Sequence, residues 1–223
     1  MRAHFFIVAF VSLVMRNAIS VELPFVAGGV RVPVTSQKAA QLRTTMLQQF
    51  DFSCGSAALA TLLTYHYGHH VSEAEVFEAM YIDGDKQLIR EKGFSLLDMK
   101  RYLDRQGFAA DGFEQPLDQL AAAKLPAIAL ISEKGYNHFV VIKGLRNNRV
   151  LLSDPANGTR ALTRTVFEGL WNNHLLFVVH NHSELAKFNE AGDWLAAPDA
   201  PLNALRGDRL TITGLTKLGP GEF

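Results

Sequence analysis

Apolar runs in the first half of the chain are bounded by the residue types that start and stop helices. The run from Cys54 is rich in Ala and Leu and ends before Gly68, a residue type that often follows the last helical turn. Capping patterns begin at Ser72 and Ser95, and Pro116 is typical of a first helical turn. These signals predict helices over 54–67, 72–81, 95–107 and 116–123. The charged stretch 83–93 is predicted to be a loop.

The second half of the chain has a different pattern. Short apolar runs are separated there by Gly, Asn and charged residues, a composition typical of strands and hairpins. We expect strands over 126–132, 137–145, 149–155 and 174–180, with one or two helical turns over 163–170. Helices followed by an antiparallel sheet indicate an α+β fold rather than a doubly wound α/β fold.

The N-terminus has the three parts of an export signal. Arg2 supplies the positive charge, an apolar stretch follows, and small residues precede Val21. We therefore expect a signal peptide over 1–20 and a periplasmic mature chain, with an uncleaved anchor as the alternative. The apolar stretch is shorter than the roughly 20 residues that a membrane-spanning helix needs, and no later segment is a credible span.

The mature chain is expected to have three parts. Residues 21–45 form an N-terminal arm or hairpin, residues 46–181 the main domain, and residues 182–223 a C-terminal extension. Gly28 and Gly29 suit a hairpin turn, which requires positive φ angles. Self-processing after Gly29 is the weaker alternative.

Charge and cysteine content limit the classes of function that the chain can have. Lys plus Arg and Asp plus Glu both number 22, so nothing in the net charge favours nucleic acid or an anionic membrane as a partner. Cys54 is the only cysteine of the 223 residues. Exported domains usually carry paired cysteines, so an unpaired thiol is an inert buried group, an intermolecular link or a reactive group.

The position of Cys54 favours reactivity. With Asp51 or Ser53 as the helix cap, Cys54 falls in the first helical turn, where free N–H groups and the helix dipole favour the thiolate. Packing alone remains the alternative, since free cysteine is often buried.

A nucleophilic thiol needs a base, and His138 has a plausible orienting partner. A hairpin turn centred near Arg146 would set His138 opposite Asp154, on the same face and within reach of its carboxylate. A strand-end histidine and an Asp-Pro turn are the alternative. His66, His69 and His70 cluster at the far end of the first helix, but no carboxylate or thiol joins them at metal-ligand spacing.

An oxyanion formed during attack on a carbonyl needs hydrogen-bond donors. The backbone N–H of Cys54 and a glutamine amide suit this role, and the residue chemistry leaves Gln48 and Gln49 equally available.

The combined motif resembles the peptidase C39 family of papain-like cysteine peptidases. Gln48 lies six residues before Cys54-Gly55, "NHFVVIKG" contains His138, and "LLSDPANG" contains Asp154. The resemblance covers 46–179 and implies a papain-like fold with helices packed on an antiparallel sheet. It also implies Cys54 as nucleophile, His138 as general base and acid, Asp154 as its orienting partner and Gln48 as oxyanion donor.

The chain departs from the family pattern in two ways. Ser53 stands where many members have Asp, and the export signal is unlike the cytoplasmic setting of family members that cleave leaders for ABC transporters. An exported member that stands alone is similar to those of functional-amyloid (Fap) secretion systems. We therefore expect an endopeptidase without metal or cofactor, acting on a protein or peptide substrate such as an amyloid subunit or another secretion component. A non-cleaving escort module and an acyl transferase are the alternatives.

Overall fold

A computed structural model describes residues 20–21, 32–33 and 36–198, which fall into two compact units divided after Ser36. In the first unit, β1 (Ser20–Val21) pairs antiparallel with β2 (Val32–Pro33). This pairing is consistent with the expected hairpin. The expected turn at Gly28 and Gly29, the expected signal peptide up to residue 19 and residues 199–223 lie outside the described residues.

The second unit contains the sheet and the helices. Its helices are α1 (Gln37–Leu42), α2 (Cys54–Thr61), the π-helical turn η1 (Leu62–His66), α3 (Glu73–Asp83), α4 (Lys86–Lys92), α5 (Leu96–Arg105), α6 (Leu117–Ala123), α7 (Arg164–Leu170), the 3-10 turn η2 (Ser183–Leu185) and α8 (Ala191–Trp194). Its strands are β3 (Ala110–Glu114), β4 (Ala127–Glu133), β5 (Tyr136–Arg146), β6 (Arg149–Asp154), β7 (Gly158–Thr163) and β8 (Trp171–Val179).

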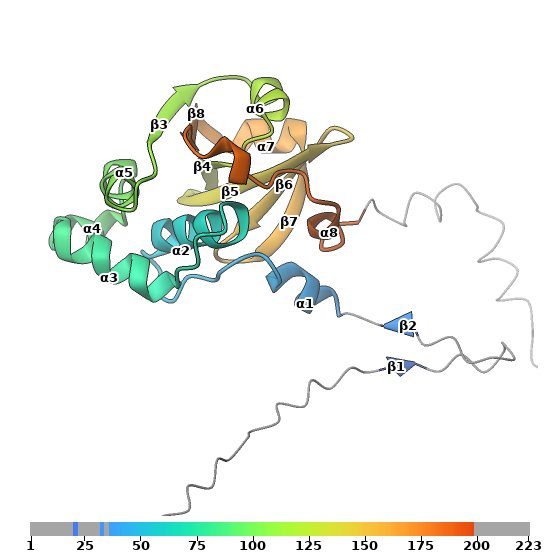
Figure 1. Cartoon of the computed structure of the whole chain (residues 1–223), viewed down its shortest axis with the longest axis horizontal. Helices are drawn as coiled ribbons and strands as arrows, with labels where there is room; N and C mark the ends of the chain where they lie inside the picture. The colour runs from blue at the N-terminus through green and yellow to red at the C-terminus, as the bar shows by residue number, and fades with distance from the viewer. Residues whose placement is uncertain (1–19, 22–31, 34–35, 199–223) are drawn as a thin grey trace, which may run out of the picture. The chain divides into compact units, whose positions relative to one another are not determined.

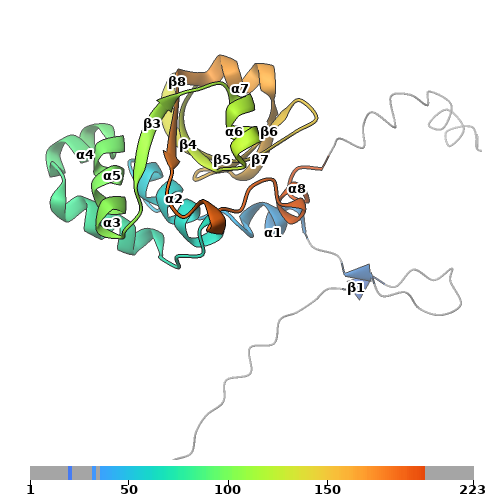
Figure 2. The same cartoon turned by 45° about the horizontal axis from the view of Figure 1, so that its top comes forward.

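The six strands form one antiparallel sheet in the order β3-β8-β4-β5-β6-β7. One face packs on α2, α3 and α5, and the other on α6 and α7 (Figures 1 and 2). β5 shows why helices cover both faces of the sheet. Phe139 and Val141 belong to the hydrophobic cluster on one face, whereas Val140 and Ile142 belong to the cluster on the other. Because successive side chains of a strand alternate between faces, a strand buried on both faces has a nearly continuous apolar run.

The α+β class is confirmed and the predicted helices and strands are present, but α1, α4, α8, β3 and β7 were not predicted. The stretch 83–93, predicted as a loop, contains α4, whose N-cap Asp85 accepts hydrogen bonds from the N–H groups of Gln87 and Leu88. Two strands were missed, β3 and β7.

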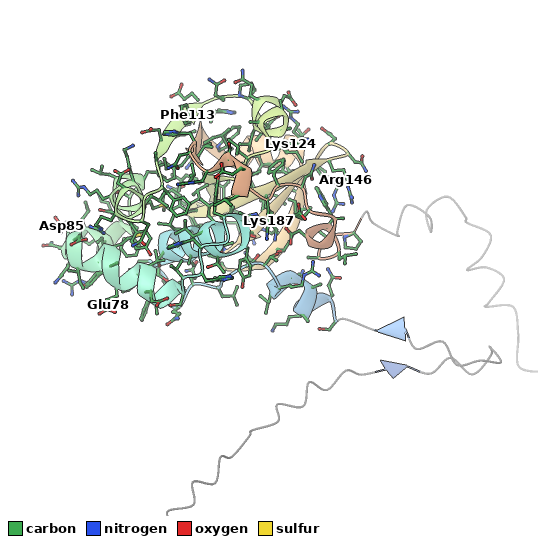
Figure 3. The ribbon with its side chains drawn as sticks, in the orientation of Figure 1. Glu78, Asp85, Phe113, Lys124, Arg146 and Lys187 are labelled. Carbon is green, nitrogen blue, oxygen red and sulfur yellow. The ribbon has the colours of Figure 1, made fainter. Side chains whose placement is uncertain are left out.

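Figure 3 shows Glu78 and Asp85 on the side of the helices that faces away from the sheet. No helix of the described residues is long and apolar enough to span a bilayer.

Residues 187–196, the C-terminal segment, pack back onto the sheet and onto η1. Asn189 donates its backbone N–H to the Lys143 carbonyl oxygen (2.8 Å) and its side-chain amide to Leu145 O (2.9 Å). The Arg146 guanidinium, at the end of the β5–β6 hairpin in Figure 3, lies 4.5 Å from the ring centroid of Trp194. The segment therefore covers one end of the β5–β6 hairpin.

His66 lies beneath this segment, and its burial predicts a pH-dependent stability. Its Nδ1 lies 2.8 Å from Lys187 O, and its Nε2 has no hydrogen-bond partner among the described residues. Burial lowers the pKa of His66 from 6.5 to about 4, although the bond to Lys187 O opposes this shift. The unfolded chain therefore binds more protons between these values, and stability should fall as the pH drops through this window.

We expect the free energy of unfolding at pH 5 to lie about 2 kcal/mol below its value at pH 7.5 on account of His66 alone. Urea unfolding at the two pH values measures this difference. His66→Leu should reduce it, whereas substitution of the exposed His174 by Asn should leave it unchanged. Equal pH dependence in wild type and His66→Leu would contradict the assignment.

Candidate active site

Cys54 is the first residue of α2, at the point where this helix meets the sheet. Ser53 is the N-cap, but its hydroxyl bonds the backbone of Phe50 instead of capping the helix. Gly55 allows close packing here, because an added Cβ would lie 2.8 Å from Met99 Cε and 3.0 Å from Phe94 Cβ. The close approach packs the N-terminus of α2 against Phe94 and against Met99 of α5.

The Cys54 sulfur lies against the backbone of β5. Its hydrogen-bonding neighbours include the backbone N–H of Phe139, the residue after His138. Cys54 is 7 % exposed, and burial raises the pKa of its thiol. The N–H groups of Phe139, Gly55 and Cys54 itself lower the pKa but do not outweigh burial. The expected preference for the thiolate is therefore wrong, since helix-terminal N–H groups cannot offset the desolvation of a buried sulfur.

His138 and Asp154 meet, although not as directly opposed residues. Val141 pairs with Ser153 and Ile142 with Leu152, so the register places His138 two residues away from the position opposite Asp154. The assumed turn centre was wrong: the hairpin turns at Asn147 and Asn148, both with positive φ, and a bulge follows Ile142. Diagonal neighbours on one face are still within reach of an imidazole.

The two side chains form a buried pair. His138 Nε2 lies 3.3 Å from Asp154 Oδ2, and the two residues are 6 % and 0 % exposed. Asp154 Oδ1 accepts hydrogen bonds from the N–H groups of Ala156 (2.9 Å) and Asn157 (3.2 Å) in the turn before β7. Burial raises the pKa of Asp154, but hydrogen bonds from His138, Asn157 and Ala156 N–H outweigh it, so its pKa lies well below the ordinary range.

Gln48 faces the same place from the connector between α1 and α2. Its backbone N–H donates to Pro155 O (3.0 Å), which fixes it beside the turn that follows Asp154. Its side-chain Nε2 donates to the carbonyl oxygens of Phe50 (2.9 Å) and Asp51 (3.3 Å). Gln49 is exposed. Of the two glutamines, Gln48 is therefore the one that lies beside His138.

A cleft of about 700 Å³ opens over these residues. Its lining includes Gln48 and His138, together with Asp51, Tyr136, Glu133, Arg160, Gln41, Lys134, Ala156 and Asn157. The Tyr136 hydroxyl donates to Asp51 O (2.6 Å) and so joins β5 to the loop before α2. Sequence reasoning missed Tyr136, Glu133 and Arg160, because only tertiary pairing brings them to the cleft.

The other histidines in the part of the chain that the structure describes form no comparable site. His180 Nε2 lies 2.9 Å from Asp111 Oδ2, but Lys100 also pairs with this carboxylate and both His180 and Asp111 are about half exposed. The thiol of Cys54 is the only one in the chain, and its pKa is influenced by the Asp154 carboxylate and by the backbone N–H of Phe139, the residue after His138. Within the described ranges, no three His, Cys, Asp or Glu side chains gather as metal ligands would.

A buried thiol at a helix N-terminus and a His–Asp pair at the edge of a cleft are the groups that a cysteine peptidase uses. The sequence model of the peptidase C39 family matches residues 43–183. The chain belongs to the peptidase C39 family, and it is a cysteine peptidase.

Relatives and a solved structure agree with this assignment. The chain is 39 % identical over 157 residues to the "Probable functional amyloid protease FapD" of Pseudomonas fluorescens, covering 70 % of this chain and 67 % of that protein. It is 36 % identical over 190 residues to the Pseudomonas aeruginosa protein of the same name, covering 84 % and 81 %. The peptidase domain of Streptococcus ComA has the same fold, with a TM-score of 0.51 and 22 % identity, over 61 % of this chain and 97 % of that domain.

Proposed function

We propose that the chain is an exported endopeptidase that cleaves a peptide bond through Cys54, His138, Asp154 and Gln48. The observation that carries the proposal is the buried His138–Asp154 pair next to the Cys54 sulfur, at the edge of a cleft. Two neighbouring residues of β5 take part: the Phe139 N–H bonds the Cys54 sulfur, and the residue before Phe139 is His138.

His138 acts first as base and then as acid. Its Nε2 carries the hydrogen that Asp154 accepts, so the lone pair of Nδ1 is left to take the thiol proton. The raised pKa of Cys54 makes this transfer necessary, because the sulfur is not ionised by its surroundings alone. The sulfur attacks the peptide carbonyl, and His138 returns the proton to the leaving amine as the C–N bond breaks. Water then hydrolyses the thioester and restores the thiol.

The oxyanion of the tetrahedral intermediate requires donors on the cleft side of the sulfur. The backbone N–H of Cys54 is one, and the Gln48 amide is the other. Gln48 Nε2 is held firmly by Phe50 O, while its bond to Asp51 O is longer at 3.3 Å. The hydrogen of the longer bond is the one that turns to the oxyanion.

We infer from the FapD relatives that the substrate is a protein of a functional-amyloid export system and that cleavage takes place in the periplasm. The test incubates the purified chain with the exported proteins encoded beside it and searches for new termini by mass spectrometry. A new terminus made by wild type, and not by Cys54→Ala, supports the proposal. Intact substrates in both reactions contradict it.

The same variant separates cleavage from escort. If secretion of the partner proteins proceeds normally with Cys54→Ala in cells, catalysis is dispensable and the chain acts as an escort. Product masses decide between hydrolysis and acyl transfer, because transfer leaves the acyl group on a second amine instead of a free carboxylate.

A further inference from the structure

Three side-chain donors approach Asp154 Oδ2, the oxygen that pairs with His138. His138 Nε2 approaches it at 3.3 Å, Asn157 Nδ2 at 3.1 Å and Arg160 Nε at 2.8 Å. The shortest of these contacts comes from a guanidinium rather than from the imidazole. A charge-assisted N–H bond at this distance is among the stronger hydrogen bonds in proteins.

Arg160 is itself fixed on both sides. Its Nη2 donates to Glu133 Oε2 at 2.7 Å, so the guanidinium bridges the carboxylates of Asp154 and Glu133. The Arg160 side chain is 22 % exposed and lines the cleft together with Glu133 and His138. Strand pairing sets Arg160 opposite Leu152, which places it on the same face as Asp154, two residues further along β6.

We propose that Arg160 is a positioning residue of this site, whose guanidinium orients the Asp154 carboxylate and offsets part of the negative charge that faces His138. The inference rests on the proposed function, since it assigns Asp154 to the orientation of a catalytic His138. A carboxylate shared with a cation stabilises an imidazolium less than an unshared one. Arg160 thereby holds the Asp154 carboxylate in the position from which it accepts the His138 N–H.

Several charged or titratable groups face His138, and their signs fix the expected directions. They are Asp154 from β6, Glu133 from β4 and Tyr136 from β5 itself, together with Arg160, Asp51 and Lys134, which line the same cleft. Loss of the Arg160 cation favours the imidazolium, so the histidine should titrate at higher pH. Loss of the Glu133 carboxylate should move the titration to lower pH.

The decisive experiment is an NMR titration of the His138 imidazole in the Cys54→Ala background, with the signal assigned by its loss in His138→Gln. We expect Arg160→Gln to raise the titration midpoint by about one pH unit and Glu133→Gln to lower it. Arg160→Lys, which keeps the cation, should restore most of the wild-type midpoint. Arg164→Gln is the matched control, because that guanidinium pairs with Asp118 and Glu168 away from the cleft.

An unchanged midpoint in Arg160→Gln, with or without a loss of stability, would overturn the proposal and leave Arg160 a purely structural role. The same shift should appear in the acidic limb of the kcat/KM profile of the Cys54 enzyme. Absence of any cleavage by wild type would refute the proposed function, but the imidazole titration would still decide the role of Arg160, because it needs no turnover.

Discussion

Replacement of Cys54 by alanine is expected to lower kcat/KM for peptide cleavage at least about a thousandfold, since no other thiol exists to form the acyl-enzyme. His138→Ala should cause a loss of similar size, because the raised pKa of the thiol makes the sulfur depend on this base. The double variant should lose little more, as expected for two residues that act in one step. Steady-state rates on a peptide that spans the cleaved bond measure all three.

Two His–Asp pairs among the described residues provide a matched control for the orienting carboxylate. Asp154→Asn should lower kcat/KM strongly, whereas Asp111→Asn, which alters the exposed pair with His180, should leave it near the wild-type value. Comparable activity of the Asp154 and Asp111 variants would remove Asp154 from the mechanism. Substantial residual activity in Cys54→Ala would remove the thiol mechanism altogether.

Removal of the Asp193 carboxylate should produce the largest loss of stability, about 3–5 kcal/mol in the free energy of unfolding. Lys143 is fully buried on β5, and its Nζ lies 3.6 Å from Asp193 Oδ1. The hydroxyls of Thr44 and Thr159 accept hydrogen bonds from the same ammonium, each at 2.8 Å. Asp193→Ala leaves the Lys143 ammonium in the interior without its carboxylate partner. An unpaired buried charge strongly destabilises the folded state.

Urea unfolding at pH 7 measures the effect. Burial lowers the pKa of Lys143 to about 8, so the loss should be smaller at pH 9, where the side chain is mostly neutral. The double variant Lys143→Met with Asp193→Leu should recover most of the stability, because an apolar pair of similar volume removes both charges. A loss below 1 kcal/mol for Asp193→Ala would contradict the argument.

Sequence reasoning selected the proposed catalytic residues but did not describe their geometry correctly. Cys54, His138 and Asp154 could be found because each residue type is scarce or lies at the end of a recognisable strand or helix. Their register could not be predicted, since it depends on whether the hairpin turns at Arg146 or one residue later. It also depends on a bulge between Ile142 and Gly144, which the strand glycine alone does not place. The direction of the Cys54 pKa shift was misjudged for a related reason. Burial of the sulfur raises this pKa, and burial depends on tertiary packing, which the sequence around Cys54 does not show.

The missed elements differ in kind. The signals for α4 were present, with Asp85 as the N-cap and Gly93 at positive φ after the last turn, but the high charge of the segment obscured them. β3 has no apolar run and contains Gly112, so only its pairing with β8 makes it a strand. Arg160 and Glu133 are ordinary surface-type residues in the sequence, and only the folded sheet gives them neighbours in the cleft.

The backfolding of residues 187–196 has a practical consequence for work on the isolated enzyme. The family match ends at residue 183, which invites expression of a fragment trimmed at that point. Such a fragment would leave the Lys143 ammonium without Asp193 and open His66 to water, and it would loosen Thr44, four residues ahead of Gln48. Weak turnover by a trimmed fragment would then reflect the loss of these stabilising contacts rather than an enzyme that is inactive in itself.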